Sequence, residues 1–205
     1  MLHKNSFKRF YGKDYVYFVV IKTKNNLPYF REPIFCDLFV EEMRISKEIK
    51  NFKLYAFSII YDHINLLIQP NDEYDVSKIM HFTKRHFSRD MNFIIGKEKL
   101  CDVNSVGDIR ECRLQESSYL YLDNVIKYHD KIIKKYKNQF NNKFISNSYP
   151  KFHWQKSFYD HVIRNETDFN NHFSYTIFNP DKHNLPSDWK YSSLNFPDII
   201  DSPDI

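Results

Sequence analysis

The sequence predicts an α+β fold in which helices cover one antiparallel sheet. Short runs of β-branched and aromatic residues alternate along the chain with longer segments whose apolar residues recur at helical spacing. The chain has 205 residues, of which 42% are hydrophobic and 18% aromatic, and this is enough to bury one core. We therefore expect a single domain with additions.

The first strand and helix are indicated by two adjacent segments. The run DYVYFVVIKT at 14–23 is apolar on both alternating faces, as expected of a central strand that is covered on each side. Pro33 suits the first turn of a helix over 33–50. The apolar stripe of this helix consists of Ile34, Leu38, Ile45 and Ile49.

Two further strands and a second helix follow. Residues 54–61 are a strand candidate, and the turn residue Asp62 precedes a second alternating segment, HINLLIQ at 63–69. A helix is expected over about 75–93. Its apolar face consists of Val76, Ile79, Met80, Phe87 and Met91. The order is therefore β-α-β-β-α.

The second half of the chain completes the sheet. Residues 152–163 are rich in aromatics and predict a fourth strand, and a third helix can start after Asn165 and must stop by Pro180. Two strand-helix units that share one sheet define a ferredoxin-like or RRM-like architecture, which we expect to carry its helices on one face.

The boundaries of the domain follow from the segments that fit this pattern less well. Residues 96–150 predict a partly helical insertion, whose best helix covers 122–140. We expect residues 1–195 to form the domain, and 196–205 to be a loosely ordered acidic tail.

Composition restricts the location of the protein more than its function. A formal net charge of +4 does not by itself indicate a nucleic-acid binder. The sparse cysteines argue against a disulfide framework and for a reducing cytoplasm: Cys36, Cys101 and Cys112. Residues 1–13 lack the apolar stretch of a signal peptide, and no run approaches the length of a membrane helix. We expect a soluble, cytoplasmic protein without a membrane partner.

Two small groups of residues could carry chemistry. His63 and Asn65 project from the same face of their strand, either as metal ligands or as scattered polar residues of an exposed strand. On the third helix, Tyr175 and Asn179 are spaced i and i+4, and His172 lies three residues before Tyr175. Alternatively, Tyr175 is a core aromatic with a satisfied hydroxyl, and Asn179 caps the helix before Pro180.

Basic residues form two candidate surfaces for phosphate contact. Lys84, Arg85 and Arg89 lie on the second helix. The insertion helix has a basic face, near Lys137, that is either solvated or in contact with phosphates: Lys127, Lys131, Lys134 and Lys135. A zinc site of Cys101, Cys112 and His129 is disfavoured because the spacing matches no common pattern.

Several segments resemble one known family. YDHINLLIQP at 61–70 is similar to the HUH strand of IS200-like transposases. Residues 154–185 resemble the C-terminal signature of REP-associated tyrosine transposases, including its closing Tyr-x-x-x-Asn-Pro, and DWKYSS at 188–193 resembles the Asp-Trp-x-Tyr-Ser-Ser of that family. With DYVYFVVIKTK at 14–24, the resemblance spans most of 8–95 and 152–195.

The resemblance implies an HUH endonuclease fold with a specific set of site residues. His63, position 65 and Asn179 would bind Mg²⁺ or Mn²⁺, and Tyr175 would be the nucleophile. His161, Arg164 and His172 would support the site, and Tyr159 is a second choice for the nucleophile. This chain departs from the family at Asn65, where a second histidine is usual; an Asn carbonyl oxygen can coordinate either ion.

The implied activity is metal-dependent nicking and joining of single-stranded or hairpin DNA through a 5′-phosphotyrosine. A metal neutralises the phosphodiester charge, and a phenol with an ordinary pKa of about 10 needs a nearby metal or base to attack. We expect a monomer or homodimer associated with the nucleoid. Two alternatives remain: a non-catalytic nucleic-acid-binding module with a decayed metal site, and an RRM-type RNA-binding sheet, for which no aromatic pair stands out.

Overall fold

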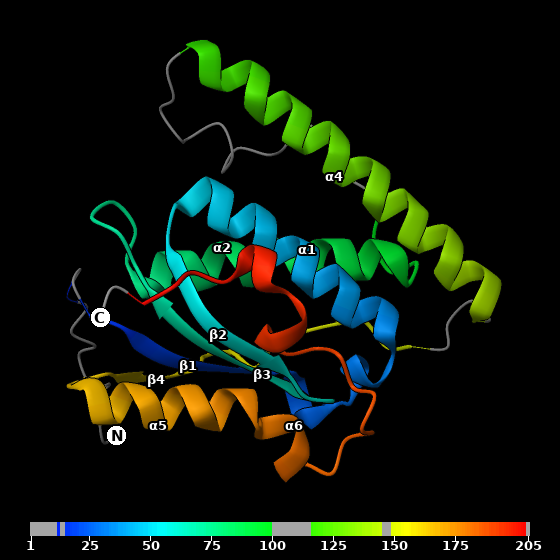
Figure 1. Cartoon of the computed structure of the whole chain (residues 1–205). Helices are drawn as coiled ribbons and strands as arrows, with labels where there is room; N and C mark the ends of the chain where they lie inside the picture. The colour runs from blue at the N-terminus through cyan, green and yellow to red at the C-terminus, as the bar shows by residue number, and fades with distance from the viewer. Residues whose placement is uncertain (1–11, 13–14, 100–115, 145–148, 204–205) are drawn as a thin grey trace, which may run out of the picture.

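The structure is a computed structural model that describes residue 12 and residues 15–99, 116–144 and 149–203; at 116–124 and 126 it describes only the helical backbone. Four strands form one antiparallel sheet in the order β2-β3-β1-β4 (Figure 1). Their bounds are β1 Tyr17–Lys22, β2 Lys53–Ile59, β3 His63–Gln69 and β4 Tyr159–Val162. This is the ferredoxin-like α+β topology that the sequence predicts.

Helices α1 and α2 cover one face of the sheet (Figure 1). The helix α1, Pro33–Lys50, starts with proline in its first turn and ends at Asn51, which adopts the left-handed conformation with φ of 46°. The helix α2, Val76–Ile94, is capped by Asp75, whose side chain accepts from the amide of Lys78. The core beneath these helices is largely aromatic: Phe30, Phe35, Phe39, Phe87, Phe152 and Trp154.

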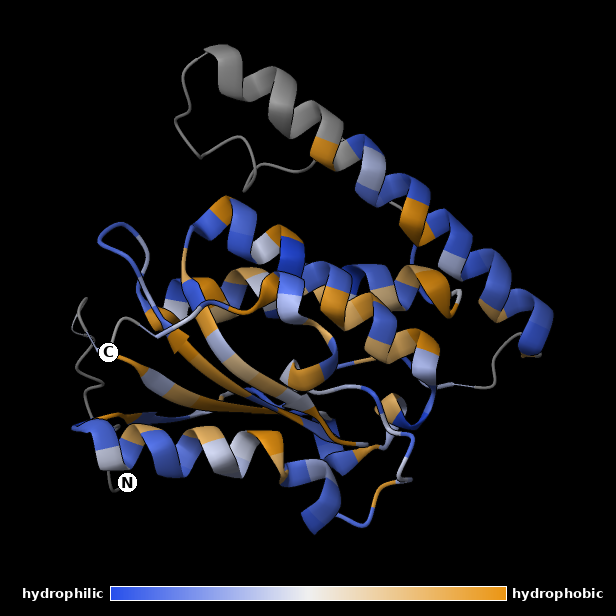
Figure 2. Cartoon of the chain, viewed as in Figure 1, coloured by the Kyte–Doolittle hydropathy of each residue, from blue (hydrophilic) through white to orange (hydrophobic). Residues whose placement is uncertain are grey.

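The opposite face of the sheet is covered by α5, Glu166–Ile177 (Figure 1). Phe169 and Phe173 of α5 pack against a second, smaller core that includes Phe18 and Leu67. The expectation of helices on one face therefore missed this helix. Both faces need cover because alternating residues of β1 are apolar, so each side of the strand buries side chains. Figure 2 shows the hydrophobic strands between the layers of helices.

The insertion contains one long helix, α4, Glu116–Lys143, which starts earlier than the sequence predicts. It lies across the outer side of α1 and α2 (Figure 1). The buried side chains Ile133 and Phe140 join α4 to the main core, while its opposite side is hydrophilic (Figure 2). The insertion is thus an added layer on the α1/α2 side.

The segment DWKYSS runs along the free edge of β2. Ser192 bridges to Ser58, and the amide of Ile59 donates to the carbonyl of Tyr191 at 2.9 Å. Ser193 Oγ accepts from the amide of Phe57 at 2.6 Å and donates to its carbonyl at 3.0 Å. This family motif therefore satisfies backbone groups at an edge that would otherwise be open to pairing.

The described part of the tail, 196–203, makes specific contacts with the body of the protein. Asp201 accepts from Lys47 Nζ at 2.6 Å and from the amide of Leu54 at 2.7 Å, and Ile199 is buried. An acidic side chain thus pairs with a lysine and the start of β2, which a reading of composition alone does not reveal. Among the described helices, none is long and apolar enough to cross a membrane.

Candidate active site on the α5 face of the sheet

A short segment after α5 joins the predicted site residues. The helix α6, Asn179–Lys182, contacts α5 and β2, and Asn179 and the adjacent His183 reach β3. Asn65 Nδ2 donates to Asn179 Oδ1 at 3.0 Å, and the ring centroids of His63 and His183 are 5.0 Å apart. Lys182 Nζ lies 4.3 Å from the ring centroid of Tyr175. The structure thus gathers His63, Asn65, Asn179 and Tyr175 around one turn of chain.

His63 lies at the start of β3 and is 8% exposed. Its Nδ1 is 2.7 Å from Asp62 Oδ1, which leaves Nε2 as the ring nitrogen available to another partner. Burial lowers the pKa of His63, and the neighbouring Asp62 carboxylate opposes this shift only in part. The imidazole is therefore neutral near pH 7, the form that binds metal ions.

Asn65 and Asn179 form a buried amide pair. They are 1% and 0% exposed, and Asn65 Nδ2 also approaches Ser58 Oγ at 3.3 Å. Asn65 Oδ1 and Asn179 Nδ2 find no hydrogen-bond partner among the described residues. A buried carbonyl oxygen without a donor is costly, and a hard divalent ion is a partner that it could take. The donor set of one imidazole and two amide oxygens fits Mg²⁺ or Mn²⁺.

Tyr175 lies on the last full turn of α5 and is 38% exposed. Its ring packs edge-on against Phe18 at 5.7 Å, so it is held against the sheet while remaining accessible from solvent. Tyr159 on β4 is 58% exposed, and its ring centroid lies 6.4 Å from that of Phe18. Both phenols therefore share one aromatic support.

Asn179 is not on the same helix as Tyr175. The helix α5 ends at Ile177, Phe178 is its C-cap, and Asn179 opens α6 with Pro180 in the first turn. This break follows from the proline, which restricts the residue before it and cannot continue a helix. The break turns the Asn179 side chain toward β3 and separates it from solvent.

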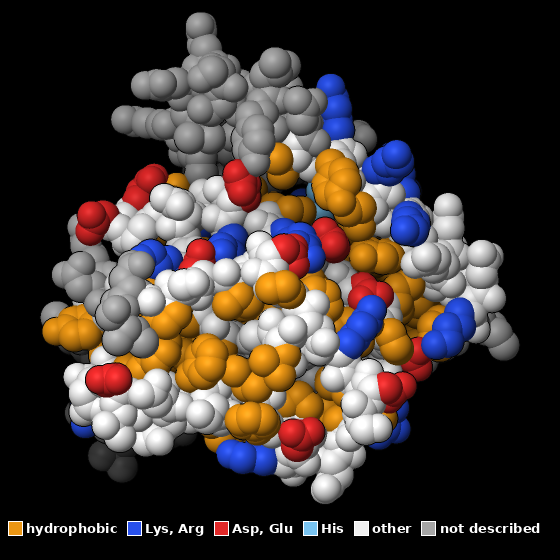
Figure 3. All heavy atoms as spheres, in the orientation of Figure 1, with side chains coloured by type: hydrophobic (Ala, Val, Ile, Leu, Met, Phe, Trp, Pro, Cys, Tyr) orange, Lys and Arg blue, Asp and Glu red, His pale blue; other side chains and the backbone are white. Residues whose placement is uncertain are grey.

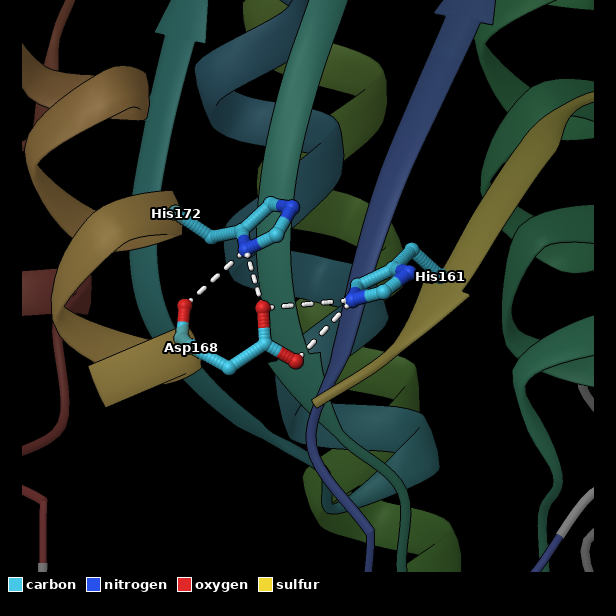
Figure 4. A group of neighbouring side chains, drawn as sticks. All are labelled: His161, Asp168 and His172. Carbon is cyan, nitrogen blue, oxygen red and sulfur yellow. Dashed lines mark hydrogen bonds and ion pairs between the residues drawn. The ribbon is translucent and has the colours of Figure 1, made fainter. Parts of the chain in front are cut away.

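Two of the expected supporting residues, His161 and His172, form a half-exposed cluster with Asp168 (Figure 4). The Asp168 carboxylate lies between His161 Nε2 and His172 Nδ1, each at 3.0 Å. Arg164 takes part through its backbone amide, which donates to Asp168 at 3.0 Å. Partial burial works to raise the pKa of Asp168, but hydrogen bonds from His161 and this amide lower it below its usual value. The rings of His161 and His172 stack with centroids 4.7 Å apart, and His172 also contacts Phe18 at 4.8 Å.

The three basic residues expected on α2 differ in their surroundings. Arg89 forks onto Asp90 at 2.6 and 3.0 Å, and Lys84 Nζ donates to the carbonyls of Gln155 and Ser157. Arg85 is exposed. These three lie on α2, behind the sheet from His63. Lys84 and Arg85 line a hollow of about 450 Å³ that also includes Lys156.

Four lysines expected on the basic face of α4 are exposed to solvent. The exposed set is Lys127, Lys131, Lys134 and Lys135. Figure 3 shows Lys and Arg side chains gathered over the described part of this helix. Of the disfavoured zinc group, Cys101 and Cys112 lie outside the described residues, and His129 is buried against Glu42.

Several residues of the site were not anticipated from the sequence. Lys182 and His183 follow Tyr175 within eight positions, but no periodic spacing marks them, since they lie beyond the helix break. Ser58 gave no signal because it occupies an ordinary strand position. Two groups of described residues could hold a metal ion: His161, Asp168 and His172 on the α5 face, and the buried Glu42, Asp90 and His129 on the other.

Comparison with known proteins gives the kind of protein that this chain is similar to. Residues 12–100 match the family described as transposase IS200 like. Its relatives include the REP-associated tyrosine transposase of Haemophilus influenzae, which is 26% identical over 148 residues, covering 70% of this chain and 60% of the relative. The chain thus spans about three fifths of that relative. The resemblance predicted from the sequence is confirmed.

A solved structure supports the fold. The structure of a REP-associated tyrosine transposase bound to a REP hairpin matches 93% of this chain and 82% of its own with a TM-score of 0.56. The sequence identity is 18%, so this match establishes the shared architecture alone.

Proposed function

We propose that this protein is a metal-dependent endonuclease and strand transferase for single-stranded DNA, with Tyr175 as its nucleophile. The observation that carries the proposal is the contact set of α6. One segment touches the phenol through Lys182, the strand imidazole through His183 and the strand amide through Asn179. A nucleophile and a ligand set held by one turn of backbone are fixed relative to each other.

His63, Asn65 and Asn179 would hold Mg²⁺ or Mn²⁺, which supplies neutralisation of the charge on the scissile phosphate. For Asn179, release from Asn65 Nδ2 would turn its carbonyl oxygen to the ion. His183 offers a second imidazole near His63, in a chain whose HUH strand has Asn65 where a histidine is usual. The Asp62 carboxylate keeps the His63 ring oriented by holding Nδ1.

Around Tyr175, the chain provides positioning and a candidate base. Phe18 supports the ring from below, and Lys182 places a positive charge over it, where a phenolate would be stabilised. His172, three residues earlier on α5, has Nδ1 held by the carbonyl and carboxylate of Asp168. Its Nε2 is thereby left to accept the phenol proton. The phosphotyrosine would keep the 5′ phosphate reactive enough for rejoining.

The substrate would be a hairpin or repeat in single-stranded DNA, as supported by the REP hairpin bound in the structural relative. Phosphates would contact Lys84 and Arg85 beside the hollow on α2, and the exposed side of α4 through Lys131, Lys134 and Lys135. Arg89 would contribute less, because Asp90 balances its charge. The protein would act as a monomer or homodimer on DNA in the cytoplasm.

A covalent-adduct assay tests this function. The purified protein is mixed with a labelled single-stranded hairpin from its flanking genome, with Mn²⁺ or with chelator, and analysed by denaturing electrophoresis. We expect a metal-dependent adduct that Tyr175→Phe abolishes while hairpin binding persists. Tyr159→Phe is the matched control, because it removes a phenol from the same aromatic support. An adduct that persists in Tyr175→Phe would contradict the assignment.

The non-catalytic binding module is the second candidate, and one observation favours it. Asn65 and Asn179 bond to each other, which is also how a decayed metal site would close. His63→Ala separates the two functions in the same assay. Loss of the adduct with retained hairpin binding supports catalysis through the metal site, whereas hairpin binding by a wild-type protein that forms no adduct supports the module.

A further inference from the structure

A second cluster of a histidine and carboxylates lies buried where α4 meets α1 and α2. Glu42 comes from α1, Asp90 from α2 and His129 from α4, and their exposed fractions are 0%, 0% and 7%. The cluster is on the α1/α2 side of the sheet, whereas Tyr175 is on the α5 side. The proposed cleavage reaction therefore gives these three residues no role, and their presence needs a separate explanation.

The three donor atoms have the spacing of a metal site. His129 Nε2 is 2.9 Å from Glu42 Oε1 and 3.3 Å from Asp90 Oδ2, and all three donors lie within 4.8 Å of one another. Zinc bonds of about 2.0–2.2 Å at tetrahedral or octahedral angles place neighbouring ligand atoms about 3 to 3.5 Å apart. The observed separations therefore need little adjustment to surround an ion.

One oxygen of the cluster lacks a partner. Glu42 Oε2 is buried and finds no hydrogen bond among the described residues. An unpaired carboxylate oxygen in the interior is costly, because water has been removed without replacement. A cation held among the three donor atoms would give this oxygen a partner.

The neighbouring charges leave room for the cation. Arg89 donates to Asp90 Oδ1 at 2.6 Å and to Oδ2 at 3.0 Å, and so orients this ligand. Glu42 Oε2 receives no hydrogen bond from Arg89 or from any other described residue. His86 is buried on the same helix, and burial lowers its pKa to about 3, so it adds a neutral imidazole to the surroundings and no competing charge.

We propose that Glu42, Asp90 and His129 bind a divalent transition-metal ion, best matched by Zn²⁺, that fastens α4 to the body of the protein. One imidazole and two carboxylates suit Zn²⁺ better than Mg²⁺, which prefers oxygen ligands and retains its waters. The ion also fixes the helix whose outer side carries Lys131, Lys134 and Lys135, so metal loading and the basic surface become linked.

Zinc titration of the full chain tests this site. A His63→Ala/His161→Ala background disables both the proposed catalytic site and the half-exposed cluster. After treatment with chelator, calorimetry should show one Zn²⁺ bound per chain, with an increase in the thermal midpoint. Adding Glu42→Gln should weaken this binding at least about 10-fold, since even outer-shell losses cost 10- to 100-fold. Adding Asp168→Asn instead is the matched control and should leave zinc affinity unchanged.

A second variant and a direct measurement of metal binding distinguish loss of the site from misfolding of the protein. His129→Gln retains hydrogen bonding to the carboxylates, and far-ultraviolet circular dichroism checks that each variant is folded. Co²⁺ added to the background protein should shift and broaden the ring resonances of His129 in the NMR spectrum. A background protein that binds no zinc, or zinc binding that Glu42→Gln and His129→Gln leave intact, overturns the proposal.

Discussion

Among the residues that the structure describes, two clusters of three side chains combine histidine with carboxylate, and they differ chiefly in access to water. Glu42, Asp90 and His129 are buried between three helices. In the cluster of His161, Asp168 and His172, each side chain is 19–27% exposed. Contact distances are similar in both, near 3 Å. In the buried cluster every charge must be balanced locally, whereas water shares that task in the half-exposed one.

Because the two clusters differ in exposure, similar side chains are suited to different roles in them. The buried cluster joins segments distant in sequence and can change its protonation only at a cost to the fold. The half-exposed cluster orders the N-terminus of α5 and presents the His172 ring beside Phe18, which also supports Tyr175. It can exchange protons with solvent, as a group that assists catalysis must.

The largest effect expected at pH 7 from this comparison is on stability. His129→Ala removes one partner of a buried charge pair and leaves Glu42 uncompensated, so the free energy of unfolding should fall by about 3 kcal/mol. His172→Ala, in the half-exposed cluster, should cost less than about 1 kcal/mol. Urea unfolding at pH 7 measures both. Equal losses would show that burial does not separate the clusters.

The next effect concerns His86, the buried imidazole beside the cluster of Glu42, Asp90 and His129. Its pKa is lowered to about 3 by burial and by the Arg89 charge, so the unfolded chain takes up a proton near pH 6.5 while the folded protein does not. Stability from this group is present above pH 6.5 and is lost as pH falls toward 3, by up to about 1.4 kcal/mol per pH unit.

The variant His86→Phe isolates this effect, because it keeps the ring contact with Phe82 and removes the titration. Unfolding free energies of wild type and variant are compared from pH 7 to pH 4. Their difference should move in favour of the variant as pH falls, even though Asp90 and His129, whose pKa values are raised, act in the opposite direction in both proteins. A pH-independent difference would place His86 in contact with water.

The sequence predicted the sheet well because alternation along β1 and β3 is a local signal. The same signal paired His63 with Asn65 on one strand face, and the helical spacing related His172 to Tyr175. Contacts between distant segments were not predictable in this way. Glu42 and His129 are 87 positions apart and on separate helices, so no periodicity relates them.

The path of the chain after the helix break and the contacts of the tail depend on distant segments in the same way. Pro180 signalled where α5 must end, but the direction of the chain after the break, which carries His183 to His63, depends on packing against β3. The tail was expected to be loosely ordered, and only the positions of Lys47 and Leu54 reveal that Asp201 has partners.

The smallest effect concerns Asp168, whose carboxylate contacts both histidines of its cluster and accepts from the amide of Arg164. Asp168→Asn should lower the free energy of unfolding by no more than about 1 kcal/mol at pH 7, because the cluster is partly solvated. The pKa of this carboxyl is lowered in the folded protein, so its stabilisation is present above the usual value near 3.8 and is lost as pH falls through the folded value.

The matched control is Asn165→Ala, since Asn165 caps the same helix through a neutral side chain that accepts from the amide of Asp168 at 2.9 Å. Its cost should not change with pH. Unfolding measured from pH 7 to pH 3 should therefore show the two variants diverging, and a constant cost for Asp168→Asn would mean that the carboxylate charge contributes nothing beyond its hydrogen-bonding geometry.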